Sequence, residues 1–134
     1  AGDPAELAIR YNQEGIDEVS PTGPTTVWEL RNDRVEQYEI HPDDFQIRPV
    51  ALDAVAGGTA PDNAAAMREV LGGKTGPLTG FVTMTAATAL LAADEVPNLA
   101  EGVSRAAEAI DDGRALRKLE LFVETTQRLS EQSA

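Results

Sequence analysis

The stretch TTVWELRNDRVEQYEI, residues 25–40, decides the fold class of this chain. Its first six residues are rich in β-branched and aromatic side chains, which favour a strand. Residues 31–34 are typical of a turn, and residues 35–40 return to a strand pattern, so we predict a β-hairpin. Two strands are too few for an independent sheet. We therefore expect the hairpin to join a larger sheet whose other strands lie outside this chain.

The segment before the hairpin allows two interpretations. Asp3, Pro4 and Glu6 have the form of a helix start, which predicts a short helix to about Tyr11. Residues 7–11 are equally compatible with a strand. Residues 12–24 contain two glycines and two prolines, and they are predicted to form a loop.

The chain after the hairpin is dominated by helical patterns. A single turn is expected near Phe45, and Asn98 with Glu101 has the spacing of a capping box at the start of a helix. The predicted helices cover residues 50–55, 62–71, 77–93, the segment from Asn98 to Gly113, and residues 114–129. The sequence thus predicts an α/β fold that is β-rich over residues 1–50 and helical over residues 51–130.

The composition narrows the class of protein. The length of 134 residues suits one domain, and a hydrophobic fraction of 42% is enough for a packed core. No apolar run approaches the roughly 20 residues that cross a bilayer, and no signal peptide is visible. The chain has no cysteine, which excludes disulfide and thiolate chemistry. We expect no membrane partner and a cytoplasmic location.

The charge balance argues against binding to nucleic acid. The chain has 23 acidic and 11 basic residues, which gives a net charge of -12. A phosphate backbone is bound by clustered Lys and Arg, and this sequence shows no such cluster. The acidic balance fits a protein kept apart from its neighbours by mutual repulsion.

The loop over residues 15–25 carries the most informative chemistry. Asp17 and Glu18 are adjacent carboxylates in a segment constrained by Gly and Pro. Such a pair suits Mg²⁺, which takes a few hard oxygen ligands and keeps its other positions for water and substrate phosphates. Hydroxyls from Ser20, Thr22 and Thr25 could bind phosphate or hold the loop. The alternative is that the pair is solvated, as most adjacent acidic residues are.

Other candidate motifs carry less information. The run Gly72–Gly76 resembles the end of a P-loop, but the upstream Gly and a preceding strand are missing, so we predict a helix-to-helix loop. His41, the only histidine, is expected at a turn or on the surface, and neither a zinc site nor a catalytic triad can be assembled. Trp28 is expected to pack the hairpin onto neighbouring structure. Asp111 and Asp112 are expected in a turn, because carboxylates are unfavourable at a helix C-terminus.

Several segments, taken in order along the chain, resemble one family. Residues 15–30, with the acidic loop and the strand after it, are similar to the acidic-motif region of anthranilate phosphoribosyltransferases. The similarity continues in order through residues 42–45, 57–65, 70–77 and 109–119. The shared order from Gly15 to Leu129, rather than a single motif, carries this resemblance.

The resemblance implies that the chain is the C-terminal portion of a larger α/β phosphoribosyltransferase domain. Members of the family transfer the phosphoribosyl group of phosphoribosyl diphosphate to the nitrogen of anthranilate, on the way to tryptophan, and they usually form homodimers. The family's acidic pair holds Mg²⁺ against the diphosphate, which makes Asp17 and Glu18 the expected metal ligands. The chain alone is expected to be inactive, because the family's glycine-rich phosphate-binding loop is absent from it.

Two departures and two alternatives accompany this resemblance. The His-Gly step that often precedes the acidic motif is replaced by residues 10–14, and Thr85 stands where many relatives carry Asn. One alternative is a non-catalytic module of the same fold that binds a partner chain. The other is a paralogue related to nucleoside phosphorylases. Asp17 and Glu18 disfavour the phosphorylase, which has no diphosphate to neutralise.

Overall fold

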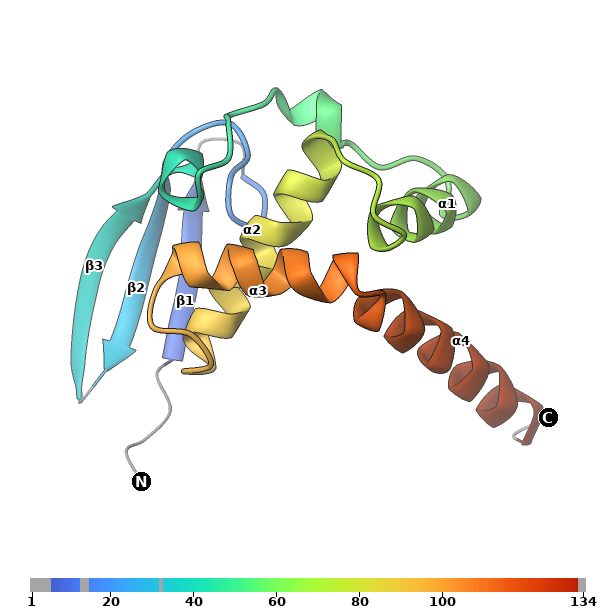
Figure 1. Cartoon of the computed structure of the whole chain (residues 1–134). Coiled ribbons are helices and arrows are strands. Elements are labelled where there is room, and N and C mark those ends of the chain that lie inside the picture. Colours follow the sequence, from blue (N-terminus) through green and yellow to red (C-terminus); the bar gives the residue numbers. More distant parts are fainter. Residues whose placement is uncertain (1–5, 13–14, 32, 133–134) are drawn as a thin grey trace. The chain divides into compact units, whose positions relative to one another are not determined.

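The computed structural model describes residues 6–12, 15–31 and 33–132 (Figure 1). The chain divides into two compact units. The first, called the sheet unit below, comprises Ala1–Ala56 and Thr75–Ala106. The second, called the helical unit, comprises Gly57–Lys74 and Ala107–Ala134. The α/β class predicted from the sequence is confirmed.

An antiparallel sheet of three strands forms the first part of the sheet unit. The strands are β1 (Glu6–Asn12), β2 (Thr25–Arg31) and β3 (Arg34–Ile40), and they lie in the order β1-β2-β3 (Figure 1). The register of β2 and β3 runs from Thr25 opposite Ile40 to Arg31 opposite Arg34, which confirms the predicted hairpin.

The strand β1 corrects one prediction and resolves one alternative. A helix to about Tyr11 was wrong, because residues 6–12 pair with β2 from Glu6 opposite Leu30 to Asn12 opposite Thr25. Pairing with a segment about 20 residues away gives these backbone groups hydrogen-bond partners that local propensity does not reveal. The proposed helix start at Asp3 and Pro4 lies outside the described residues. The chain itself therefore supplies a third strand, which we had expected to come from elsewhere.

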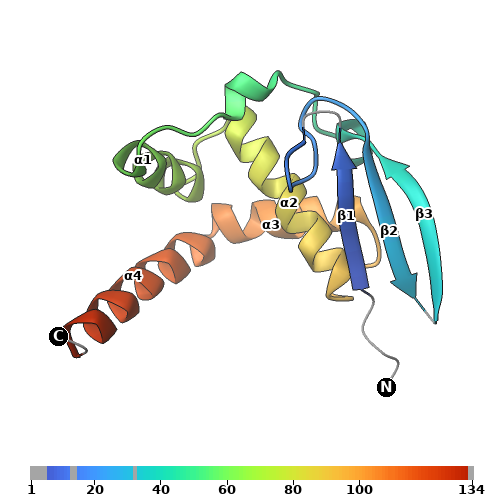
Figure 2. The same cartoon turned by 180° about the vertical axis from the view of Figure 1, so that it is seen from behind.

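The core of the sheet unit lies between the sheet and two helices. After the 3₁₀ turns η1 (Pro42–Phe45) and η2 (Leu52–Val55), α2 (Pro77–Ala92) and the first part of α3 (Leu99–Asp111) cover one face of the sheet (Figures 1 and 2). The buried cluster consists of Val19, Val27, Ile40, Phe45, Met84 and Ala87. At the crossing of α2 and α3, a Cβ atom on Gly102 would lie 2.9 Å from the Cα, Cβ and carbonyl oxygen of Ala87. Only glycine allows this approach without a shift of the backbone.

The helical unit contains α1 (Ala60–Leu71), the last turn of α3 and α4 (Arg114–Gln132). A capping box begins α1, with Thr59 and Asp62 bonded to each other. Within the described part of this unit, Val70 and Ile110 are the buried apolar side chains, and α4 buries none. The four long helices lie within a few residues of their predicted bounds. Over the described residues, none of them is long and apolar enough to cross a membrane.

Candidate functional site

The acidic loop, residues 15–24, connects β1 to β2 and is fixed through its middle. Val19 and Ser20 are 1% and 0% exposed, and Pro21 is also fully buried. Asp17 is exposed and Glu18 is half-buried. The predicted ligand pair therefore lies directly before a segment that is built into the core of the sheet unit.

Hydroxyl groups hold this loop in shape. The backbone N–H of Ser20 donates to Oγ1 of Thr25 over 2.8 Å, and both residues are 0% exposed. Oγ of Ser20 accepts from the backbone N–H groups of Thr22 and Gly23 over 3.1 and 3.2 Å. Of the two roles predicted for these hydroxyls, the structure supports the one that holds the loop. A buried hydroxyl with several partners also fixes the backbone that presents the carboxylates.

The segment of residues 47–50, called the strap below, runs beside the acidic loop, and the sequence did not predict this. The backbone N–H of Val50 donates to the carbonyl of Pro21 over 2.9 Å. Figures 1 and 2 both place the segment that follows η1 next to the acidic loop. The turn into this segment is made by Gln46, which ends η1 with φ of 59°. The direction of this segment depends on the left-handed conformation of Gln46. A positive φ is uncommon at Gln, so the sequence contains no signal for it.

The donor set of the loop fits a magnesium ion that is shared with a ligand. Asp17 and Glu18 offer hard carboxylate oxygens, and the described residues contain no group of three or more His, Asp or Glu side chains arranged to hold a metal. A full protein cage would be needed for a structural metal. Mg²⁺ in phosphate-transfer sites instead takes one or two carboxylates, and substrate phosphate and water complete its octahedron.

The remaining sequence candidates have structural roles. Gly72–Gly76 forms the predicted loop between α1 and α2, and Nζ of Lys74 pairs with Glu69 over 2.6 Å. His41 is exposed beside η1, as expected, and its backbone N–H donates to Asp44 over 2.7 Å. Trp28 is half-buried on β2.

Asp112 lies in the predicted turn, and the structure adds the reason for its position. Its carboxylate accepts the backbone N–H of Arg114 over 2.9 Å, at the start of α4. That hydrogen bond is the main reason why the pKa of Asp112 is lowered. A carboxylate that is unfavourable at the end of α3 is therefore favourable at the start of the next helix.

A charged depression lies at the other end of the hairpin, away from the acidic loop. It has a volume of about 320 Å³ and is lined by Glu29, Arg31, Arg34 and Glu36. Arg31 pairs with Glu29 over 2.9 Å and with Asp94 over 3.2 Å. These ion pairs tie the hairpin to the turn after α2. No residue predicted to bind a metal or substrate lines this depression.

Tyr38, on β3 of the same hairpin, has a raised pKa. The hydroxyl of Tyr38 donates to Glu29 over 3.1 Å. Burial of the ring, followed by this hydrogen bond, raises the pKa of Tyr38 to about 12. Neutral tyrosine is thus the form that the folded sheet stabilises.

Known proteins can be compared with this fold and loop. A family model described as glycosyl transferase family, a/b domain, matches residues 5–116. A curated anthranilate phosphoribosyltransferase of Dehalococcoides mccartyi is 40% identical over 124 residues, which are 91% of this chain and 36% of the relative. The chain thus spans just over a third of the length of the curated relatives it matches.

Solved structures agree with the sequence relatives. Anthranilate phosphoribosyltransferase from Saccharomyces cerevisiae in complex with 4-fluoroanthranilate superposes with a TM-score of 0.80 at 31% identity, over 88% of this chain and 35% of that one. The same yeast enzyme in complex with PRPP and Mg gives a TM-score of 0.78 at 29% identity, over 92% of this chain and 35% of that one. By these matches the chain belongs to the glycosyl transferase family, in its a/b domain.

Proposed function

We propose that this chain is the C-terminal, magnesium-holding part of the α/β catalytic domain of an anthranilate phosphoribosyltransferase. The intact enzyme transfers the phosphoribosyl group of phosphoribosyl diphosphate to the nitrogen of anthranilate in tryptophan biosynthesis. The observation that carries this proposal is the exposed carboxylate of Asp17, next to Glu18, on a loop fixed by the buried residues Val19 and Ser20. Relatives named for this activity, including one solved with PRPP and Mg, support it.

The chemistry of the transfer suits this loop. As the glycosidic bond breaks, negative charge accumulates on the leaving diphosphate, and a magnesium ion held by Asp17 and Glu18 would neutralise that charge. The hydrogen bonds of Ser20 hold the loop backbone before the substrate arrives. Less reorganisation is then needed when the charge develops. No side-chain nucleophile is required, which agrees with a sequence that has no Cys and one His.

The rest of the enzyme supplies the other contacts in this proposal. The chain spans 36% of the Dehalococcoides relative, so the groups that grip the ribose phosphate and receive anthranilate belong to the remaining part. We place the intact enzyme in the cytoplasm as a homodimer. Its partners are then its own remaining chain and its two small substrates, with no nucleic acid and no membrane.

The metal assignment is tested on the chain itself by calorimetric titration with Mg²⁺. The unmodified chain is expected to bind Mg²⁺, and the double variant Asp17→Asn, Glu18→Gln is expected to bind it much more weakly, because amide oxygens carry no charge. Glu36→Gln, Glu39→Gln is the matched control, since it removes two exposed carboxylates from β3 of the same unit. Equal loss of Mg²⁺ affinity in both variants would show only a general charge effect and would remove the assignment.

An activity assay tests whether essential substrate contacts lie in the remaining part of the enzyme. The purified chain is incubated with phosphoribosyl diphosphate, anthranilate and Mg²⁺, and no phosphoribosyl anthranilate is expected to form. Turnover at the rate of a full-length relative would contradict the proposal that essential substrate contacts lie in the remaining part. In the intact enzyme, the Asp17→Asn, Glu18→Gln variant is expected to change the dependence of the rate on Mg²⁺ concentration.

A further inference from the structure

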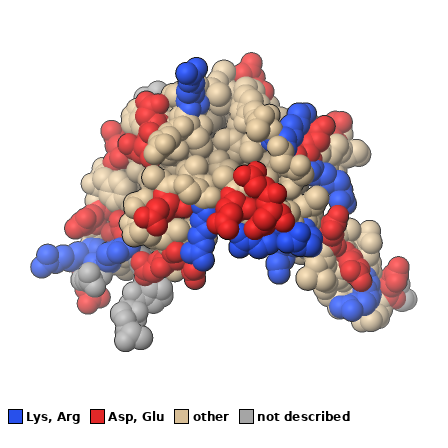
Figure 3. Space-filling model, in the orientation of Figure 1, with Lys and Arg blue, Asp and Glu red and all other residues tan. Residues whose placement is uncertain are grey.

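A polyanionic substrate faces an electrostatic obstacle at the acidic loop. The chain has a net charge of -12, and acidic side chains are spread over the face shown in Figure 3. One Mg²⁺ offsets the carboxylates of Asp17 and Glu18, but a diphosphate brings further negative charge of its own. A cation close to the loop would therefore favour the binding of this substrate.

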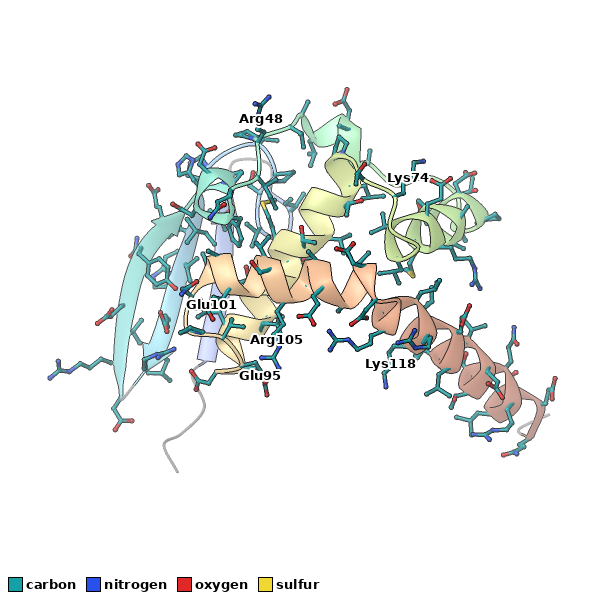
Figure 4. The ribbon with its side chains drawn as sticks, in the orientation of Figure 1. Arg48, Lys74, Glu95, Glu101, Arg105 and Lys118 are labelled. Carbon is teal, nitrogen blue, oxygen red and sulfur yellow. The ribbon has the colours of Figure 1, made fainter. Side chains whose placement is uncertain are left out.

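Few of the described cationic side chains of the sheet unit are able to do this. Its arginines with described side chains are Arg31, Arg34, Arg48 and Arg105. Arg31 forms ion pairs with Glu29 and Asp94. Arg105 pairs with Glu95 over 3.4 Å, and Figure 4 shows these two side chains near each other. Arg34 lies at the far end of the hairpin, where β2 turns into β3. Among these four described arginines, Arg48 is the one that lies near the loop.

The backbone around Arg48 is fixed on both sides. Ile47 packs against the buried cluster, and Val50 is bonded to Pro21 of the acidic loop over 2.9 Å. Pro49 restricts Arg48 to an extended backbone conformation. The side chain is exposed and is directed outward from the ribbon in Figure 4. No ion pair or side-chain hydrogen bond engages its guanidinium within the part of the chain that the structure describes.

We infer that Arg48 binds the phosphate oxygens of the diphosphate substrate whose magnesium is held by Asp17 and Glu18. This inference rests on the proposed function and adds a second contact from the same chain. A planar guanidinium donates two parallel hydrogen bonds to a phosphate group, which a lysine ammonium does not reproduce. The strap from Ile47 to Val50 presents this donor without the cost of ordering a mobile segment.

The test is a calorimetric titration of the chain with inorganic diphosphate at saturating Mg²⁺. The Arg48→Gln variant is expected to bind diphosphate about tenfold more weakly, as for loss of a charge-assisted hydrogen bond. Arg48→Lys is expected to recover only part of that affinity. Arg34→Gln is the matched control, because it removes one exposed arginine from the same unit and should leave diphosphate affinity unchanged. Mg²⁺ alone should bind equally well to all four proteins.

The outcomes separate this inference from the proposal on which it rests. If Arg48→Gln and Arg34→Gln bind diphosphate equally, or if the unmodified chain binds none at saturating Mg²⁺, the role of Arg48 is overturned. Retention of Mg²⁺ binding by Asp17→Asn, Glu18→Gln would instead remove the metal assignment. Arg48 is exposed, so a thermal melt is expected to show that the Arg48→Gln variant folds like the unmodified chain.

Discussion

The two units of this chain have similar fractions of apolar residues but bury them to different extents. In the sheet unit, Phe45, Met84, Val27 and Ala87 are each no more than 1% exposed and form one cluster. In the helical unit, α4 repeats apolar residues at helical spacing, yet Phe122 is 64% exposed and Leu121 is 53% exposed. An amphipathic pattern therefore predicts a helix in both units, but it predicts a core only where another element packs on the apolar side.

This difference has consequences for stability and for the site. A small unit with few buried apolar side chains is marginally stable, because burial has to offset the loss of chain entropy. The sheet unit also holds the acidic loop through Val19, Ser20 and Pro21. We expect the loop to share the higher free energy of opening of that unit, and the helical unit to open at a lower free energy.

The largest predicted effect is on the free energy of unfolding, when one phenylalanine in each unit is replaced by alanine. Phe45→Ala is expected to lower the free energy of unfolding by about 3–5 kcal/mol, because it leaves a cavity in the cluster. Phe122→Ala is expected to change it by no more than about 0.5 kcal/mol, since its ring is mostly solvated. The measurement is urea unfolding followed by two probes: the fluorescence of Trp28, the only tryptophan, for the sheet unit, and helical circular dichroism for the helical unit.

The Phe122→Ala variant is also the control for the difference between the units. A cost at Phe122 equal to that at Phe45 would mean that α4 is covered in solution by something that the described residues do not provide. Helical circular dichroism of the same samples shows whether α4 stays folded when its ring is removed.

The next effect concerns the crossing of α2 and α3 in the sheet unit. Gly102→Ala is expected to destabilise the chain by about 1–2 kcal/mol, because the new methyl group would lie 2.9 Å from Ala87 and force α2 and α3 apart. This net cost already includes the intrinsic gain of alanine over glycine in a helix, which is about 1 kcal/mol and is smaller than the cost of overpacking. Gly23→Ala is the matched control, since a Cβ there meets no atom within 4 Å. A stabilised Gly102→Ala variant would show that the crossing is loose.

Local signals in the sequence predicted most of the helical part of the fold. Thr59 with Asp62, Asn98 with Glu101, and the glycines after α1 and α3 act within one or two turns, so their effect is visible in a short window. The strand β1 was ambiguous for the opposite reason. Its partner β2 lies beyond a loop, and pairing between distant segments is not encoded in the residues of either one.

The candidate site was predicted in its composition but not in its support. Asp17 and Glu18 stand out in sequence because Gly and Pro flank them. The strap, residues 47–50, brings Arg48 to the loop. Its position depends on the left-handed Gln46 and on the backbone hydrogen bond from Val50 to Pro21, which are 29 residues apart. Neither feature leaves a pattern in the sequence. The gap in the prediction is thus long-range backbone pairing, as it was for β1.

A smaller effect is expected at the start of α1 and tests the helical unit by itself. Thr59→Ala removes the side chain that caps α1 and should cost about 1 kcal/mol. If the helical unit opens separately, hydrogen exchange should speed up in α1 and remain unchanged in β2 and β3. Thr126→Ala is the control, because Thr126 is exposed in the interior of α4 of the same unit and does not cap a helix. Uniform acceleration in both units would show that they open together.

The smallest effect is a dependence on alkaline pH that belongs to the sheet unit. The pKa of Tyr38 is raised from 10.0 to about 12, so the folded chain keeps this proton when the unfolded chain has lost it. The contribution of Tyr38 to stability is then complete below about pH 10 and is lost as the pH rises from about 10 to 12. Solvent screening at a half-buried ring keeps the whole change below about 1 kcal/mol. In Tyr38→Phe the decline over this range should become shallower, as measured by urea unfolding at several pH values. An identical decline in Tyr38→Phe would assign it to other groups and would leave the hydrogen bond to Glu29 without a role in the stability of the hairpin.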